Sequence, residues 1–305
     1  MDDLPPTSLI ICSRNRPRLL LETVETVLKG NCVPRELIII DQSNIALPEL
    51  AERTVERDCR LRYVLSSSTG VCRARNEGAA LASQPLLVFI DDDMLVPPDW
   101  FGILVEALVC AGPDSVVCGR VLPGPAELPG GFVPALVEEL EPHTYQGRIN
   151  TDVLTTCHMA MYGSLFRASG GLDERLGPGT RFPAGDDNEY GFRLLEAGYK
   201  IVFTPQAVIH HRAWRSEQEY YPLRWNYGRG KGGFYTKYIS LRDPYLFKRM
   251  LNDLSIRFIR FPWRVLHKPR LALGDLYYAF GMISGSIEWA WTYWFNQAPP
   301  TDTRS

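Results

Sequence analysis

The chain has 305 residues, of which 45% are hydrophobic and 22% charged, and this composition excludes a disordered or collagen-like protein. Its formal net charge is -2, so we expect no nucleic-acid partner. Residues 212–270, however, hold 14 Lys and Arg against 4 Asp and Glu. The overall balance therefore conceals one basic tract toward the C-terminus.

Cysteine usage and the N-terminus indicate the compartment. The seven cysteines are scattered and form no C-x-x-C pair, which argues against a disulfide framework or a zinc site. The N-terminus lacks the basic and apolar segments of a secretory signal. Glu288 interrupts the most apolar late stretch, 277–295, which argues against a spanning helix. We therefore expect a cytoplasmic protein.

The first part of the chain alternates between predicted strands and helices. Three apolar runs, 9–12, 37–40 and 86–90, are typical of strands buried on both faces, and 61–65 is a weaker fourth. An amphipathic pattern that starts near Pro17 predicts a helix between the first two strands. Such alternation predicts an α/β fold with a mainly parallel sheet flanked by helices.

Polar residues follow the predicted strands, and parallel strands collect ligands beyond their carboxyl ends. We expect one crevice to gather the residues at these ends, namely Ser13, Asp41, Asp91, Asp92 and Asp93. Two glycine- and proline-rich stretches, 122–134 and 170–185, are predicted as loops over it.

The three adjacent aspartates would repel one another at a strand end. Mg²⁺ or Mn²⁺, shared with substrate phosphates, would relieve that repulsion. The alternative is a solvated acidic turn.

Asp186 and Asp187 lead into a helix predicted near 190–198. One of the two carboxylates is a candidate general base on an acceptor hydroxyl, and helix capping is the alternative. His210 and His211 end the next apolar run, and one imidazole is a candidate further metal ligand, with a purely structural pair as the alternative.

Residues 228–233 are rich in glycine but lack the spacing of a nucleotide-triphosphate loop. We expect a flexible basic segment whose Arg229 and Lys231 close over a pyrophosphate. The alternative is a solvated basic turn.

Seven motifs occur in order along the chain: LIICSRNRP, LIIIDQSN, GVCRARNEGAA, FIDDDMLVPPDW, GGLDE, GDDNEYGFRLLEAGYKIVFTPQAVIHH and YGRGKG. Together they make residues 7–235 resemble the family 2 glycosyltransferases of the GT-A fold. The resemblance implies a Rossmann-like catalytic domain over 1–212, with a nucleotide-sugar half to about 120 and an acceptor half over 121–212. A mostly helical, basic and aromatic extension is expected over 213–305.

The resemblance also implies roles for individual residues near the donor. Asp91 would lie near the ribose, Asp93 on the metal and Asp41 against the base. Arg75 and Asn76 would lie near the diphosphate sugar. We place Ser13, Asp92, Arg229 and Lys231 in the same nucleotide-sugar site.

The late motifs imply the remaining roles. Asp187 stands in the position of the catalytic base, next to Asp186, which replaces the family's usual Glu. His211, six residues after Pro205, matches the late metal-binding histidine. His158 stands where the family often has Asn, which suggests unusual sugar recognition.

The expected function is transfer of a sugar, with inversion, from a nucleotide diphosphate sugar to a hydroxyl of a glycan or lipid-linked acceptor, dependent on Mg²⁺ or Mn²⁺. One alternative is a noncatalytic nucleotide-sugar or glycan binding module of the same fold. A sugar nucleotidyltransferase is a further alternative, but the first strand is not followed by the glycine-rich loop that it would need.

Beyond the resemblance, basic and apolar residues alternate closely over 248–270, and three tryptophans follow by 294. Such a mixture predicts peripheral attachment to the cytosolic membrane face through 248–295. The alternatives are packing against the catalytic domain and a homodimer contact.

Overall fold

The computed structural model describes residues 4–55 and 57–295, which form two compact units. The first contains the chain up to residue 174 together with 187–217, and the second contains 175–186 and the residues from 218 onward. The helical extension expected from 213 is present in the second unit. Part of the glycine-rich stretch, 175–186, joins those helices, and the sequence did not predict this.

The first unit is built on one sheet with the strand order β3-β2-β1-β4-β8-β6-β9-β5, and β7 pairs with β9. Strands β3, β2, β1 and β4 are parallel to one another, whereas β8 is antiparallel to both β4 and β6. The strands are β1 (Thr7–Ser13), β2 (Glu36–Asp41), β3 (Arg60–Leu65), β4 (Leu86–Asp91), β5 (Met94–Leu95), β6 (Ser115–Pro123), β7 (His143–Gln146), β8 (His158–Tyr162) and β9 (Lys200–His211). The four predicted strands are confirmed.

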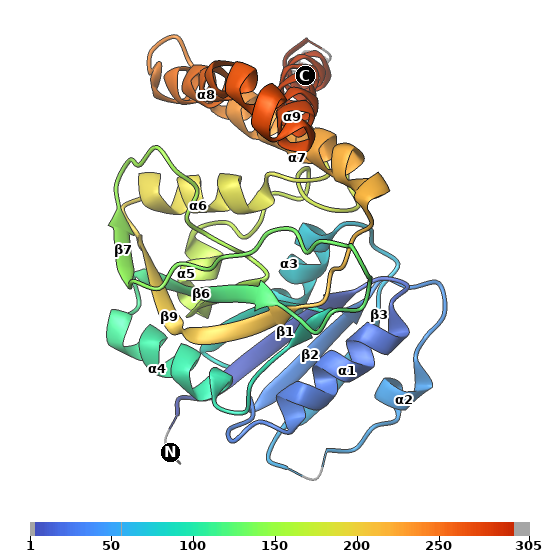
Figure 1. Cartoon of the computed structure of the whole chain (residues 1–305). Helices are drawn as coiled ribbons and strands as arrows, with labels where there is room; N and C mark the ends of the chain where they lie inside the picture. The colour runs from blue at the N-terminus through green and yellow to red at the C-terminus, as the bar shows by residue number, and fades with distance from the viewer. Residues whose placement is uncertain (1–3, 56, 296–305) are drawn as a thin grey trace, which may run out of the picture. The chain divides into compact units, whose positions relative to one another are not determined.

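Helices cover both faces of this sheet (Figure 1). Helices α1 (Pro17–Leu28) and α4 (Trp100–Ala111) pack in one hydrophobic cluster with Leu9, Ile11 and alternate residues of the neighbouring strands. Helices α3 (Val71–Leu81), α5 (Gly163–Ala168) and α6 (Asp186–Glu196) pack in a second cluster on the other face, with Ile10 and Ile38. Burial on both faces explains why these strands lack polar alternation, and the predicted α/β class is confirmed. A short helix, α2 (Pro48–Ala51), precedes β3.

Strand β9 contains an irregularity that sets the position of its end. Its register against β6 shifts between the pairs Gly119↔Thr204 and Arg120↔Val208. The extra residues include Pro205, which has no N–H to donate to a ladder and is therefore suited to a bulge. Beyond the bulge, β9 pairs with β5, which sets His211 opposite Met94.

The second unit consists mainly of α7 (Tyr220–Tyr238), α8 (Tyr245–His267) and α9 (Pro269–Ala290). A 3₁₀ turn, η1 (Glu217–Glu219), precedes α7, and a π turn, η2 (Trp291–Phe295), follows α9. No helix in the described part of the chain combines the length and apolar character needed to cross a membrane.

The expected flexible segment at 228–233 is wrong, because these residues form the middle of α7. Their glycines allow α7 and α9 to pack with their backbones in contact. A Cβ on Gly228 would lie 2.0 Å from the carbonyl oxygen of Tyr278, and one on Gly285 would lie 2.0 Å from that of Arg229. The glycine pattern therefore serves helix packing, which compensates for the low helix propensity of glycine.

Candidate active site

The carboxyl ends of β1, β2 and β4 meet at one edge of the sheet. Ser13 is the register partner of Asp41, and the neighbouring Cys12 is the partner of Asp91. The Ser13 hydroxyl donates a 2.6 Å hydrogen bond to Asp92 Oδ2. The predicted gathering of polar strand ends is confirmed.

The three consecutive aspartates form the turn between β4 and β5. Thr23 of helix α1 holds this turn, since its hydroxyl donates to the Asp92 carbonyl at 2.7 Å and accepts from the Met94 N–H at 3.1 Å. Asp92 and Asp93 are buried, whereas Asp91 is half-buried. The interpretation as a solvated acidic turn is therefore wrong.

Arg16, which the sequence analysis did not single out, neutralises part of this charge. Its Nη1 lies 3.2 Å from Asp92 Oδ1 and 2.9 Å from Asp93 Oδ2. Burial, followed by the charge of Asp93, still raises the pKa of Asp92 well above its ordinary value. The signal in the sequence was a second arginine directly before Pro17, at the start of α1.

Of the two histidines at the end of β9, His211 reaches the aspartates. Its Nε2 lies 3.3 Å from Asp93 Oδ1, and both side chains are buried. Burial opposes the charge on each group, but the hydrogen bond and charge of the partner raise the pKa of His211 and lower that of Asp93. A carboxylate oxygen and an imidazole nitrogen side by side suit a transition-series cation such as Mn²⁺.

The described residues do not form a complete metal site around Asp93 and His211. Among residues 4–55 and 57–295, no three His, Cys, Asp or Glu side chains are grouped so that they could hold a metal ion by themselves. A cation on Asp93 and His211 would therefore need further oxygens from a phosphate-bearing ligand, which is the usual arrangement for Mg²⁺ and Mn²⁺ with nucleotides.

Arg75 connects Asp91 to Asp187 through one threonine. Its Nη2 lies 2.5 Å from Asp91 Oδ1, and its Nη1 donates to Thr156 Oγ1 at 2.7 Å. The Thr156 hydroxyl donates to Asp187 Oδ1, and the Thr156 N–H donates to the same oxygen at 2.9 Å. Thr156 is buried, and nothing in the local sequence pointed to it.

Asp186 and Asp187 begin helix α6 but differ in their surroundings. Asp187 groups with the first unit and Asp186 with the second. Asp186 is buried against Gly177, where an added Cβ would approach the carboxyl carbon to 2.9 Å. Asp187, half-buried, is the one oriented by Thr156.

Asp41 is buried at the end of β2 and held by two neighbours. Its Oδ2 accepts from the Tyr63 hydroxyl at 2.7 Å, and its Oδ1 accepts from the Ser43 N–H at 2.9 Å. Burial and the hydrogen bond to Asp41 raise the pKa of Tyr63 to about 12.

Asn76 ties helix α3 to the loop at 171–174. Its Nδ2 donates to the Leu172 carbonyl at 2.9 Å and to Glu174 Oε1 at 3.2 Å, and its Oδ1 accepts from the Leu172 N–H at 2.9 Å. These contacts give Asn76 a positioning role in the structure, whereas its predicted contact with the donor stays a prediction.

His158 is fully buried on β8, so its side chain does not reach solvent. That sugar recognition is unusual where it replaces the family's Asn stays a prediction. Its Nε2 accepts a 2.8 Å hydrogen bond from the Trp100 indole. Burial lowers the pKa of His158 to about 3, which keeps the imidazole neutral as an acceptor.

Arg229 and Lys231, placed by sequence in the nucleotide-sugar site, belong to helix α7 of the second unit. Two nitrogens of Arg229 contact Glu288, each at 2.7 Å. Lys231 is buried, with its Nζ 5.2 Å from the ring centroid of Phe234 and 5.0 Å from that of Tyr235. Their assignment to the donor site stays a prediction.

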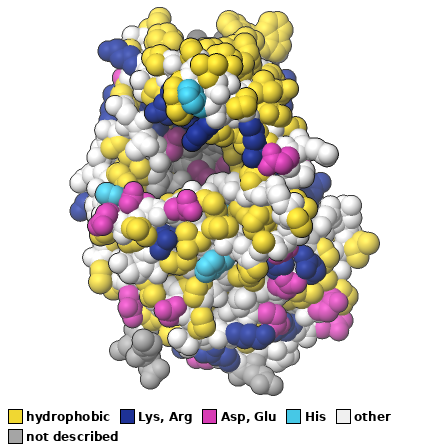
Figure 2. All heavy atoms as spheres, in the orientation of Figure 1, with side chains coloured by type: hydrophobic (Ala, Val, Ile, Leu, Met, Phe, Trp, Pro, Cys, Tyr) yellow, Lys and Arg dark blue, Asp and Glu magenta, His cyan; other side chains and the backbone are white. Residues whose placement is uncertain are grey.

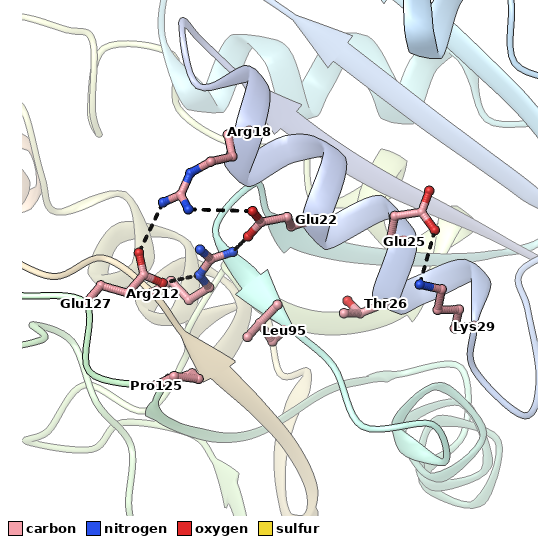
Figure 3. Close-up of a pocket in the computed structure, with 9 residues that line it drawn as sticks. All are labelled: Arg18, Glu22, Glu25, Thr26, Lys29, Leu95, Pro125, Glu127 and Arg212. Carbon is pink, nitrogen blue, oxygen red and sulfur yellow. Dashed lines mark hydrogen bonds and ion pairs between the residues drawn. The ribbon is translucent and has the colours of Figure 1, made fainter.

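A shallow pocket of about 720 Å³ lies beside helix α1 (Figure 3). Arg212 enters it directly after His211 and contacts both Glu22 and Glu127. The Arg212 N–H also donates to the Asp93 carbonyl at 2.9 Å. The ion pairs therefore hold the residue after His211 against α1 and Glu127, and the backbone hydrogen bond ties the same residue to the aspartate turn.

Comparison with known proteins identifies the family of this chain. The family model described as "Glycosyl transferase family 2" matches residues 8–169, so the chain belongs to family 2 of the glycosyltransferases. The matched segment holds the strand ends, the aspartate turn, Arg75 and Thr156.

Individual relatives resemble different shares of the chain. A validoxylamine A glucosyltransferase of Streptomyces hygroscopicus subsp. limoneus is 31% identical over 150 residues, which is 48% of this chain and 33% of that protein. The chain thus spans about a third of the length of this relative. A glucosyl-dolichyl phosphate glucuronosyltransferase of Haloferax volcanii is 25% identical over 233 residues, 70% of this chain and 71% of the relative.

Solved structures share the fold. A mannosyltransferase of Pyrobaculum calidifontis, in complex with GDP-Man and Mn²⁺, superposes with a TM-score of 0.62 at 15% identity, covering 96% of this chain and 89% of the other. GalNAc-T7 with UDP, GalNAc and Mn²⁺ gives 0.53 at 19% identity, with 80% and 52% covered. At these identities the likeness concerns the GT-A architecture.

Proposed function

We propose that this chain transfers a sugar from a nucleotide diphosphate sugar to an acceptor hydroxyl, with inversion at the anomeric carbon and with the help of a divalent cation. The observation that carries the proposal is the aspartate turn, where two buried carboxylates lie within reach of Arg16, Ser13 and His211. The relatives named above are called glycosyltransferases of several sugars, which supports the reaction class and leaves the sugar open.

Asp93 and His211 would hold the cation, together with oxygens of the diphosphate. Held there, a divalent cation would offset the charge that develops on the departing diphosphate. Asp91, oriented by Arg75, would face the ribose, and Asp41 would face the base.

Asp187 would accept the proton of the acceptor hydroxyl. As that oxygen bonds to the anomeric carbon, the bond from this carbon to the diphosphate breaks, and its electron pair leaves with the diphosphate. Direct displacement from the opposite side inverts the configuration. The two hydrogen bonds from Thr156 keep the Asp187 carboxylate in one orientation, which is what a general base requires.

A panel of nucleotide diphosphate sugars, each tested with Mn²⁺, with Mg²⁺ and with EDTA, tests this function. Thermal shift identifies the preferred donor, because a ligand that binds only the folded state stabilises it. Release of the nucleoside diphosphate, with and without glycan and lipid-linked acceptors, then measures turnover. A donor that binds in a cation-dependent way but is neither transferred nor hydrolysed would show a binding module and overturn the proposal.

A further inference from the structure

We propose that helices α8 and α9 bind the surface of an anionic lipid bilayer, with α9 lying along the interface. This inference concerns the second unit alone and does not depend on the reaction proposed above. The composition of residues 248–295 shows cations and apolar groups, and the structure shows which of these side chains reach solvent.

Helix α9 has two unlike faces. One face carries Gly281, Met282, Gly285 and Trp289, which are buried, and its glycines contact α7. The opposite face is exposed and apolar, and its residues recur every three or four positions, which places them in one stripe along the helix and into η2. This stripe consists of Leu273, Tyr277, Phe280, Ile283, Ile287, Trp291 and Trp294.

Helix α8 exposes a comparable set of large side chains. Ile259 is 76% exposed, Leu266 is 80% exposed and Trp263 is 55% exposed. Figure 2 shows hydrophobic side chains gathered over the region that α8 and α9 occupy in Figure 1, with basic side chains near them. Contiguous exposed apolar side chains of this kind mark interaction sites on protein surfaces.

The acidic side chains of α8 and α9 are paired and are not exposed. The acids of α8 and α9 are Asp253, Asp275 and Glu288, and none is exposed. Each is neutralised by arginine: Asp253 by Arg257, Asp275 by Arg264, and Glu288 by Arg181 and Arg229.

Several basic side chains of this region, in contrast to the acids, are exposed. Lys248, Arg260 and Lys268 are exposed, whereas Arg229, Arg257 and Arg264, the helical arginines that pair with these acids, are half-buried. The exposed charges, which lie on α8 and at Lys268 between the two helices, are therefore positive. The same helices expose aromatic and aliphatic side chains.

This distribution of charge favours a bilayer over a second copy of the chain. A symmetric dimer through α8 and α9 would bring like positive charges together. Neither helix has an exposed acid that could balance these charges. Anionic headgroups complement the cations, and tryptophan and tyrosine are suited to the boundary between headgroups and acyl chains. With one side packed against protein and the other apolar, α9 is suited to lie in the interface plane of a bilayer without crossing it.

Sedimentation of the full chain with vesicles tests the proposal. We expect the chain to pellet with vesicles of phosphatidylglycerol and phosphatidylcholine, to bind phosphatidylcholine alone more weakly, and to be partly released at high salt. The double variant Lys248→Glu/Arg260→Glu should bind the anionic vesicles about tenfold more weakly or worse. Ile259→Ser/Leu266→Ser should lower binding to a similar degree by removing apolar contacts.

Matched variants in the first unit serve as controls. Arg60→Glu/Lys200→Glu changes the net charge by the same amount at exposed positions of the first unit, and Ile45→Ser/Leu140→Ser removes side chains that are 81% and 65% exposed. Both controls should bind like the unmodified chain. All of these side chains are exposed, so unfolding should be little affected, and thermal denaturation checks this.

Three results would overturn the proposal. The first is no vesicle binding by the unmodified chain, and the second is equal vesicle binding by the α8 variants and their controls. The third is a dimer of the unmodified chain in solution that Ile259→Ser/Leu266→Ser converts to monomer without any vesicle binding, since that would assign the surface to a second copy.

Discussion

Arg75 Nη2 lies 2.5 Å from Asp91 Oδ1, and Nη1 of the same buried guanidinium donates to Thr156, the residue that orients Asp187. One side chain on helix α3 therefore links the proposed donor side of the site to the proposed base. The fork geometry of arginine makes this possible, because two of its nitrogens reach different partners at once.

Replacing this arginine tests the link. Arg75→Lys keeps the charge but cannot contact Asp91 and Thr156 in the same way, so we expect kcat/KM to fall by about a hundredfold or more. Steady-state kinetics with the preferred donor measures the loss. Arg73→Lys, at an exposed neighbour that pairs with Glu174, is the matched control and should retain activity.

The choice between the two adjacent aspartates is the second prediction. Asp187→Asn should lower kcat by about 10²- to 10⁴-fold with donor affinity nearly unchanged, as expected for loss of a general base. Single-turnover kinetics and donor titration separate the two effects. If Asp186→Asn is inactive while Asp187→Asn turns over normally, the base is the residue buried against Gly177.

The proposed cation ligands predict both a mutant effect and a pH dependence. Asp93→Ala should abolish Mn²⁺-dependent nucleotide binding and leave the fold intact. Because Asp93 raises the pKa of His211, and a cation binds only the neutral imidazole, Mn²⁺ affinity should weaken as the pH falls through that raised value. Calorimetric titration of Mn²⁺ with the nucleotide across pH measures this. Tight Mn²⁺-dependent binding by Asp93→Ala would contradict the assignment.

Glu36 of β2 predicts a stability effect that is separate from catalysis. Burial opposes its ionisation, but the Ser8 hydroxyl at 2.6 Å and the Ser83 N–H at 2.9 Å lower its pKa below the ordinary 4.5. A lowered folded pKa stabilises the protein above pH 4.5, and this contribution is lost as the pH falls through the folded value.

Glu36→Gln should therefore reduce the free energy of unfolding by about 1.5–3 kcal/mol at neutral pH, the range for hydrogen bonds to charged groups. The difference from the unmodified chain should shrink in acid, because the glutamine does not titrate. Urea denaturation at several pH values measures it. A constant difference across pH would contradict the role of the charge.

The space around two helical glycines, Gly285 of the second unit and Gly102 of the first, predicts opposite effects for their substitution by alanine. Gly285→Ala places a Cβ 2.0 Å from the Arg229 carbonyl oxygen, so it should destabilise the chain by about 1–3 kcal/mol or more. Gly102→Ala in α4, whose nearest neighbour would be 4.0 Å away, should stabilise it by about 0.5–1 kcal/mol. Thermal denaturation of both variants compares them, and equal effects would show that α7 and α9 tolerate separation.

Much of the site could be predicted from residue order alone. Buried strands such as β1 and β4 are continuous apolar runs, and the polar residue after each run must fall at the sheet edge because parallel strands share a direction. The sequence alone therefore predicts that Ser13, Asp41 and Asp91 lie at the same edge of the sheet.

What the sequence determined by itself is local: the apolar runs, the turn of three aspartates and the basic, aromatic C-terminal tract. Tertiary structure alone decided what each side chain contacts, because a contact joins residues that are far apart in the chain. The glycines of 228–233 lie in a helix whose backbone is packed against α9. Thr156, in the segment before β8, orients Asp187 because folding brings it between Arg75 and the start of α6. Composition shows that residues 248–295 hold cations and apolar groups, but only the folded helices decide that the acids among them are paired and that Lys248, Arg260 and Lys268 are exposed.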